Sequence, residues 1–263
     1  SGRYIEESIA AALAQTYPNI ELIIADDGSE DEATKTILQG LDDPRIRVLY
    51  LAHGGPAAAR KAAIEAANGT YILPLDSDDL IDPPYLSEAI EILERDASVG
   101  LVSCNAEFFE AETGTWDLSH VTIAQMLANS SIHVTTVFRK ADYERVGGYD
   151  PHLLMQEDWD LQLSILELGR RFVCLPKTYF HYRRRADGSS IMQQAGDVAQ
   201  VCQNYDYVVS RHLPLYQAHT RAFAAILRKM LVKQTQTSSH LRRLVESRTG
   251  GRAVEKLSIL IVT

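Results

Sequence analysis

The first hundred residues alternate short apolar runs with segments of helical pattern, and this alternation restricts the folds that the chain can adopt. The apolar runs have the length of strands buried on both faces. The predicted strands are residues 20–25, 46–51, 70–75 and 99–104, and the predicted helices are residues 5–17, 30–38, 56–67 and 85–94. Strands that are joined through helices run parallel. The pattern therefore predicts an α/β fold with a doubly wound, mostly parallel, Rossmann-like sheet, in which ligands bind at the carboxyl ends of the strands.

The second half of the chain has a less regular pattern and ends in helices. The predicted elements are a hairpin over residues 107–116, strands at residues 132–139 and 178–184, a helix at residues 157–168 and further helices from Ile191 onward. A doubly wound domain usually begins with a strand, whereas this chain begins with a helix and has a strand pattern at residues 258–263. That segment is predicted to begin a following domain or to replace a missing first strand, and an ordinary edge strand is the alternative.

The 263 residues suffice for one sizeable globular domain, and their charge is unevenly distributed. The net charge of −9 argues against general nucleic-acid binding. Residues 211–256 nevertheless contain ten Lys or Arg and two Asp or Glu, so this region carries +8 and the remainder −17. Such a basic region predicts peripheral contact with an anionic membrane or an anionic acceptor, and a solvated helix face is the alternative.

The cysteines and the apolar runs bear on the compartment. Cys104, Cys174 and Cys202 are far apart and odd in number, so neither a disulfide framework nor a CxxC metal motif is indicated. No run reaches the roughly 20 apolar residues that a membrane-spanning helix needs, and no signal peptide is visible. These features predict a reducing compartment, the cytoplasm, with the inner face of the membrane as a place of contact.

Two acid clusters follow predicted strands. One is Asp26-Asp27, and the other is Asp76-Ser77-Asp78-Asp79. Neighbouring carboxylates repel one another unless a cation compensates them. Hard cations such as Mg²⁺ and Mn²⁺ bind carboxylate oxygens and share their ligand shell with substrate phosphates. The second cluster therefore predicts a metal–diphosphate site, and an acidic turn that only precedes the next helix is the alternative.

Four local patterns occur in a fixed order along the chain. They are Gln15–Ser29 (QTYPNIELIIADDGS), Gly54–Arg60 (GGPAAAR), Asp76–Asp79 (DSDD) and Gly147–Asp160, which contains GGY and QEDWD. Together they resemble the family-2 glycosyltransferases with the GT-A fold, over about residues 3–190. The resemblance implies a GT-A domain at residues 1–190 without its first strand. The pattern of the remaining residues predicts a helical basic extension at residues 191–256 and a strand at residues 257–263, which either begins an adjoining domain in a longer chain or replaces the missing first strand.

The resemblance assigns donor-binding roles to several side chains. It implies that Asp26 and Asp27 contact the nucleobase, and the alternative is that they only cap the following helix. Arg60, Asp76 and Arg183 are the remaining implied contacts to the donor nucleotide. Guanidinium groups suit diphosphate oxygens, although a basic helix or strand face explains both arginines as well.

The resemblance also implies a cofactor and a base. Asp78, Asp76 and Asp79 are the implied ligands and supports of Mn²⁺ or Mg²⁺. Asp158 is the implied general base and Glu157 its support. Both acids lie at the start of a predicted helix, where the helix dipole by itself would favour them.

The function implied is inverting transfer of a sugar from a nucleotide-diphosphate sugar, a UDP-sugar in particular. The acceptor is a saccharide, a lipid-linked saccharide or a protein, and no nucleic acid is expected as a partner. Two alternatives remain open. One is a sugar-nucleotide pyrophosphorylase, which normally carries a Gly-rich, Arg-containing signature after its first strand. The other is a non-catalytic module that binds nucleotide or carbohydrate.

Overall fold

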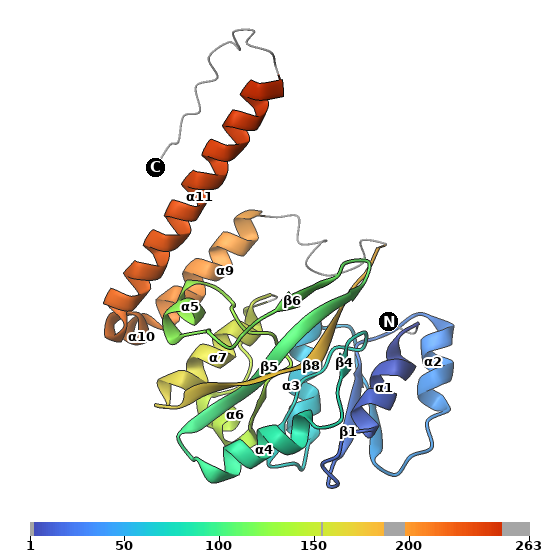
Figure 1. Cartoon of the computed structure of the whole chain (residues 1–263). Coiled ribbons are helices and arrows are strands. Elements are labelled where there is room, and N and C mark those ends of the chain that lie inside the picture. Colours follow the sequence, from blue (N-terminus) through green and yellow to red (C-terminus); the bar gives the residue numbers. More distant parts are fainter. Residues whose placement is uncertain (1–2, 154, 187–197, 249–263) are drawn as a thin grey trace. The chain divides into compact units, whose positions relative to one another are not determined.

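The computed structural model describes residues 3–153, 155–186 and 198–248, with side chains as far as residue 235. The chain divides into two compact units, Ser1–His219 and Thr220–Thr263. The first unit contains all the described strands and most of the helices (Figure 1). The terminal strand predicted at residues 258–263 lies outside the described residues.

The elements follow the predicted alternation in the first half of the chain. The strands are β1 (Leu22–Asp26), β2 (Ile46–Tyr50), β3 (Tyr71–Ile72), β4 (Leu80–Ile81), β5 (Val99–Glu110), β6 (Gly114–Trp116), β7 (Val137–Arg139) and β8 (Arg171–Arg184). The helices are α1 (Ile5–Leu13), α2 (Glu32–Gln39), α3 (Pro56–Ala66), α4 (Tyr85–Arg95), α5 (Ile123–Ala128), α6 (Lys140–Val146), α7 (Glu157–Glu167), α9 (Val198–Arg211), α10 (Leu213–Ala218) and α11 (Thr220–Arg248).

β1 and β2 form a parallel pair that is connected through α2. α1 and α2 lie beside this pair, where Ile5 and Ile9 of α1 form a buried cluster with Leu38 of α2 (Figure 1). Asp31 caps α2, because its carboxylate accepts hydrogen bonds from the backbone N–H groups of Ala33 and Thr34. The cap of α2 is therefore Asp31 and not the Asp26-Asp27 cluster that precedes it.

A larger sheet has the strand order β3-β7-β5-β8-β4, with β6 paired to β5. β5 and β8 run parallel through the middle of the unit (Figure 1). The other pairs of this sheet are antiparallel among the described residues, so the sheet is mixed and not mostly parallel as predicted. The physical reason is that β6 returns through a tight hairpin, while β3, β4 and β7 are short strands that reach the sheet from loops.

Several predicted strands differ in length from the observed ones. β5 extends to Glu110, beyond the predicted end at residue 104, and β7 begins at Val137, after the predicted start at residue 132. Of the predicted strand at residues 70–75, only Tyr71 and Ile72 pair, and the rest leads unpaired into the second acid cluster. β8 begins at Arg171, ahead of its predicted start at residue 178. Its pairing with β5 shifts register after Leu175, where Pro176 has no N–H to donate.

α7 lies in the interior of the first unit. Trp159, Leu163 and Ile165 are fully buried, and the polar side chains of Asp160 and Gln162 on other faces of this helix are buried as well. Burial on all sides shows that the helix is enclosed by other elements. The start of α7 is thus held by packing, which is relevant because it carries Glu157 and Asp158.

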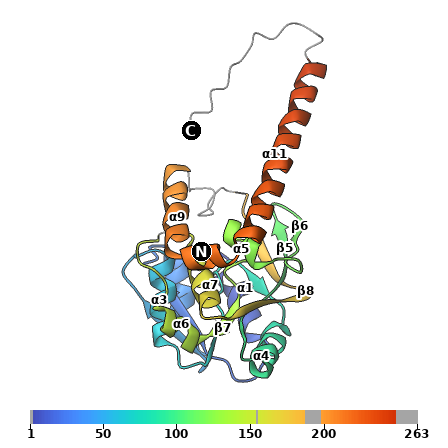
Figure 2. The same ribbon diagram turned by 90° about the vertical axis from the view of Figure 1, so that its left-hand side faces the viewer.

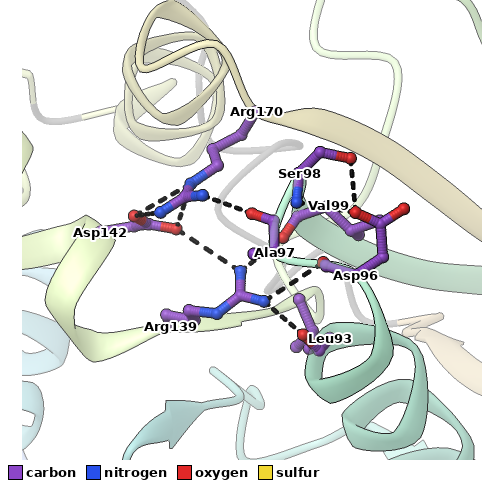
Figure 3. Close-up of polar contacts among 8 residues, drawn as sticks. All are labelled: Leu93, Asp96, Ala97, Ser98, Val99, Arg139, Asp142 and Arg170. Atoms are coloured by element: carbon purple, nitrogen blue, oxygen red, sulfur yellow. Dashed lines mark hydrogen bonds and ion pairs between the residues drawn. The ribbon is translucent and has the colours of Figure 1, made fainter.

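An ionic cluster fixes the amino ends of β5 and β8 (Figure 3). Arg139 donates to the backbone carbonyls of Leu93 and Val99, and Arg170 donates to Asp142 over 2.8–3.2 Å. Asp142 also lies 3.8 Å from Arg139. The guanidinium of Arg139 therefore satisfies a carbonyl at the end of α4, and Asp142 is shared by both arginines.

No described helix is both long and apolar enough to cross a lipid bilayer.

Candidate active site

Arg60 joins two acids that are distant in the sequence. From α3, its guanidinium donates to Asp76 Oδ1 at 2.6 Å and to Glu157 Oε1. Asp76 follows β3, and Glu157 begins α7. The side chains of Arg60 and Glu157 are 18% and 8% exposed, whereas that of Asp76 is 38% exposed. The structure thus brings three of the predicted site residues together, and Asp76 is the most exposed of them.

The acid turn at residues 76–79 presents its three carboxylates differently. Asp78 Oδ2 lies 2.6 Å from Arg185 of the chain that follows β8, and its side chain is 19% exposed. Asp79 is 1% exposed and accepts from the backbone N–H of Arg183 at 2.9 Å. Burial raises the pKa of Asp79 to about 9, and repulsion from Asp76 adds to the effect. Asp79 is therefore protonated at neutral pH and suited to holding the turn.

Asp76 and Asp78 are the carboxylates whose chemistry fits a divalent cation. No three His, Cys, Asp or Glu side chains in the described part of the chain are arranged to hold a metal by themselves. Magnesium-type sites often use only one or two carboxylates, because substrate phosphates and water complete the shell. The two residues fit that kind of shared site, in which the donor diphosphate supplies the other oxygens.

The first acid cluster organises the loop ahead of α3. Asp27 accepts from the backbone N–H groups of Gly54 at 2.7 Å and Gly55 at 2.9 Å. Asp26 Oδ1 accepts from the N–H of Ser29 at 3.1 Å. Since this loop leads directly into α3, Asp27 sets the position from which Arg60 reaches Asp76 and Glu157.

Glu157 is buried and its neighbour Asp158 is partly buried at the start of α7. Burial raises the pKa of Asp158, and Arg60 opposes that rise. Burial also raises the pKa of Glu157, with repulsion from Asp158 as the next cause. Asp158 Oδ1 accepts from the N–H of Trp159 at 2.8 Å. The expected stabilisation of their charge by the helix dipole is thus outweighed by burial, and the pair holds protons more readily than exposed carboxyls do.

The backbone before α7 is held in an unusual conformation. Gln156 has a φ of +66°, which lies in the left-handed region that a non-glycine residue rarely adopts. Gly148 has a φ of +76°, and an added Cβ there would lie 2.7 Å from the ring of Tyr143. Such backbone persists only where surrounding contacts determine it. The turn of the chain that presents Glu157 and Asp158 is therefore specified by its neighbours.

Tyr149 is a site residue that was not singled out from the sequence. It is 3% exposed, and together with Asp158 it lines a small internal cavity. Its ring contacts Tyr143 edge to face at 5.6 Å. The sequence signal was its place in the Gly147-Gly148-Tyr149 pattern, but that it lines the same cavity as Asp158 could not be inferred from spacing.

Arg183 lies behind the acid turn. It donates to the carbonyl of Asp78 at 2.7 Å, to Glu110 at 3.0 Å and to Glu7 at 2.6 Å. Its guanidinium also lies 4.2 Å from the ring centre of Tyr4. The structure thus places Arg183 on protein groups that brace the turn, and its predicted contact with the donor remains a prediction.

The Glycosyl transferase family 2 model matches residues 1–145. An uncharacterised glycosyltransferase of Rickettsia prowazekii is 32% identical over 178 residues, which are 63% of this chain and 55% of that protein. The minor teichoic acid biosynthesis protein GgaB of Bacillus subtilis is 26% identical over 204 residues, which are 73% of this chain and 23% of that protein. The chain thus spans little more than half the length of the first of these relatives and less of the second.

The solved structure of S. aureus TarS 1–349 in complex with UDP-GlcNAc resembles this chain with a TM-score of 0.62 at 18% identity. The match covers 85% of this chain and 72% of that chain. It confirms the predicted α/β fold of the GT-A type. Because the family model matches more than half of the residues, the chain belongs to glycosyl transferase family 2.

Proposed function

We propose that this chain transfers a sugar from a nucleotide-diphosphate sugar to a saccharide acceptor, with inversion at the anomeric carbon. The observation that carries the proposal is the link made by Arg60 between Asp76 and Glu157. It puts the acid turn, which suits a donor diphosphate, next to the acid pair at the start of α7, which suits proton transfer. A transferase needs both functions within the reach of one sugar ring.

On the donor side, Asp76 and Asp78 would hold Mn²⁺ or Mg²⁺ against the diphosphate. Such a cation, when bound, neutralises the charge that develops on the leaving nucleoside diphosphate. Asp26 and Asp27 would face the nucleobase and ribose from the end of β1. A UDP-sugar is the proposed donor, because TarS, which shares the fold, has been solved with UDP-GlcNAc.

On the acceptor side, Asp158 would act as the general base. The acceptor hydroxyl oxygen attacks the anomeric carbon while Asp158 takes the hydroxyl proton. The bond between that carbon and the diphosphate oxygen breaks, and its electron pair leaves with the nucleoside diphosphate. Burial raises the pKa of Asp158, which makes its carboxylate a stronger proton acceptor near neutral pH. One base and one leaving group correspond to a single displacement, hence to inversion.

A cell-surface polysaccharide or its lipid-linked precursor is the proposed acceptor class, since GgaB takes part in minor teichoic acid biosynthesis. We also propose that α11 makes peripheral contact with an anionic membrane on the cytoplasmic side. Its described side chains include Arg228 and Lys229 on one face and exposed Leu227 and Met230 on another. Basic amphipathic helices of this kind bind at lipid headgroups.

The experiment that tests the donor site is calorimetric titration of UDP, GDP and CDP, each with and without Mn²⁺. We expect metal-dependent binding of UDP that is lost in Asp78→Ala and kept in Asp43→Ala. Asp43 pairs with Arg45 on the surface, away from the acid turn, so that it serves as a matched acid control. Binding that does not depend on Mn²⁺, or equal loss in both variants, would contradict the assignment of Asp78.

The base is tested by Asp158→Asn with a saccharide acceptor. We expect sugar transfer to fall by about 100-fold or more, because the amide cannot take the proton. UDP binding, measured by the same titration, should stay unchanged and thereby show that the variant is folded. A variant with full transfer activity would refute the role of Asp158.

A further inference from the structure

The helices α9 and α10 pack directly on the elements that carry the acid pair. In both views they lie beside α5 and α7 (Figures 1 and 2). Asn204 donates to the carbonyl of Met155 at 3.3 Å, just ahead of α7. The ring of Tyr205 lies 5.2 Å from that of Trp159, and Tyr216 donates to the carbonyl of Leu127 at 2.6 Å. These two helices are therefore an integral part of the transferase unit.

A buried ionic cluster lies at the junction of α9 and α10. Arg211 Nε lies 3.0 Å from Asp160 Oδ1, and another nitrogen of the same guanidinium donates to Asp150. His212 Nε2 lies 3.0 Å from the same oxygen of Asp160. His212 Nδ1 lies 3.2 Å from Glu167, close enough for an ion pair but not aligned as a hydrogen bond. The side chains of Asp150, Asp160 and His212 are at most 5% exposed.

The partners of Arg211 are placed on either side of the acid pair. Asp150 directly follows Tyr149, and Asp160 lies two positions after Asp158. By contacting both, Arg211 joins the two ends of a segment that contains Gln156, with its left-handed backbone, and the acids at 157 and 158. His212 holds the same helix at Asp160 and, two turns further, at Glu167.

We propose that Arg211 and His212 are positioning residues that hold Glu157 and Asp158 in place opposite Arg60 and Asp76. The proposal rests on the proposed function in so far as Asp158 is the base. The physical reason is that Arg211 joins the two buried carboxylates. Without it, Asp150 keeps His152 and Tyr207, and Asp160 keeps His212, but each loses a charged partner and the link between them is broken. In the absence of Arg211, the segment between Asp150 and Asp160 relaxes from its left-handed turn at Gln156 and displaces the base.

The experiment compares Arg211→Met with Arg211→Lys. We expect Arg211→Met to bind UDP with Mn²⁺ as the wild type does but to lose about 100-fold in kcat, because a base displaced by an ångström loses its alignment. Arg211→Lys should recover part of the kcat, since an ammonium can pair with one of the two carboxylates. Arg171→Met, which breaks the exposed pair with Asp96, is the matched control and should change neither quantity.

Amide hydrogen exchange separates this proposal from the proposed function. In Arg211→Met, exchange should become faster in residues 150–153 and 155–160 and stay unchanged in β5 and β8. A wild-type chain that transfers no sugar would refute the proposed function, and the exchange result would still decide whether Arg211 holds this segment. If exchange around the acid pair is unchanged in Arg211→Met, the proposal is overturned. It is also overturned if the affinity of this variant for UDP falls by the same factor as its kcat. If Arg211→Met does not fold, His212→Gln with the same measurements keeps the proposal falsifiable.

Discussion

At the scale of single residues, burial gives neighbouring carboxyls different chemistry. Asp76 and Asp78 face arginines near the surface, whereas Asp79, in the same turn, is enclosed. Burial raises the pKa of Asp79 to about 9. One acid of the turn is thereby a neutral hydrogen-bonding group, while the outer two remain suited to a cation. The letters of the DSDD pattern do not show this division.

The raised pKa of Asp79 predicts how stability depends on pH. Between its ordinary pKa of 3.8 and about 9, the folded state binds a proton at Asp79 that the unfolded state releases. The free energy of unfolding should therefore fall as the pH rises through this window. In Asp79→Asn, whose amide mimics the protonated acid, the part of this pH dependence that is due to residue 79 disappears.

Urea unfolding at pH 5.5 and pH 8.5, with a chelator present, is the measurement for Asp79. We expect the free energy of unfolding of Asp79→Asn, taken relative to that of the wild type, to be larger at pH 8.5 than at pH 5.5. Asp43→Asn is the control on the surface and should show no such gain. A difference between Asp79→Asn and the wild type that is the same at both pH values would show that the carboxyl is ionised in the folded state.

At the scale of elements, the cluster of Arg139, Asp142 and Arg170 joins the end of α4 to the starts of β5 and β8 (Figure 3). The side chain of Asp142 is 3% exposed and faces two guanidinium groups. The acid turn meets the opposite, carboxyl end of β8. β8 is therefore held at both of its ends, by the ionic cluster at its start and by the acid turn near its last residues.

Asp142→Asn should lower the free energy of unfolding by about 3 kcal/mol, because two partly buried arginines lose their shared carboxylate. Chemical denaturation monitored by circular dichroism measures the change. Glu112→Gln removes a carboxylate from the exposed pair with Arg184 and should cost less than about 1 kcal/mol. Equal costs for the two substitutions would show that the cluster does not hold the sheet.

At the scale of the whole molecule, charge is divided between the two ends of the sequence. The basic residues gather from position 211 onward, and the acids dominate before it. This division is the basis for the proposed membrane contact of α11. Each basic residue near an anionic bilayer contributes about 1 kcal/mol, and salt screens the attraction.

Co-sedimentation with vesicles that contain anionic lipid tests this contact. The wild-type chain should bind at low salt and be released at high salt, and the double variant Arg228→Glu with Lys229→Glu should bind weakly. Lys35→Glu and Lys61→Glu together make the same charge change in the first unit and should leave binding unaltered. Equal loss in both double variants would refute a specific role for α11.

Much of this organisation follows from local pattern. The helices at residues 56–67, 85–94 and 157–168 and the hairpin near residue 114 were predicted to within a few positions, because side-chain periodicity and turn residues are local properties. The ordered motifs also led to the correct family and fold. The mixed direction of the large sheet was not predicted, because pairing depends on which distant strand a short segment meets.

The sequence by itself determined the elements, the family and the candidate residues. Only the tertiary structure decided which of them meet. It brought Arg60 to Asp76 and Glu157, turned Asp79 inward, placed Arg183 behind the acid turn and set Arg211 across Asp150 and Asp160. The physical reason is that burial and ion pairing depend on three-dimensional neighbours from remote parts of the chain. A motif specifies the chemical groups, and the fold specifies their environment.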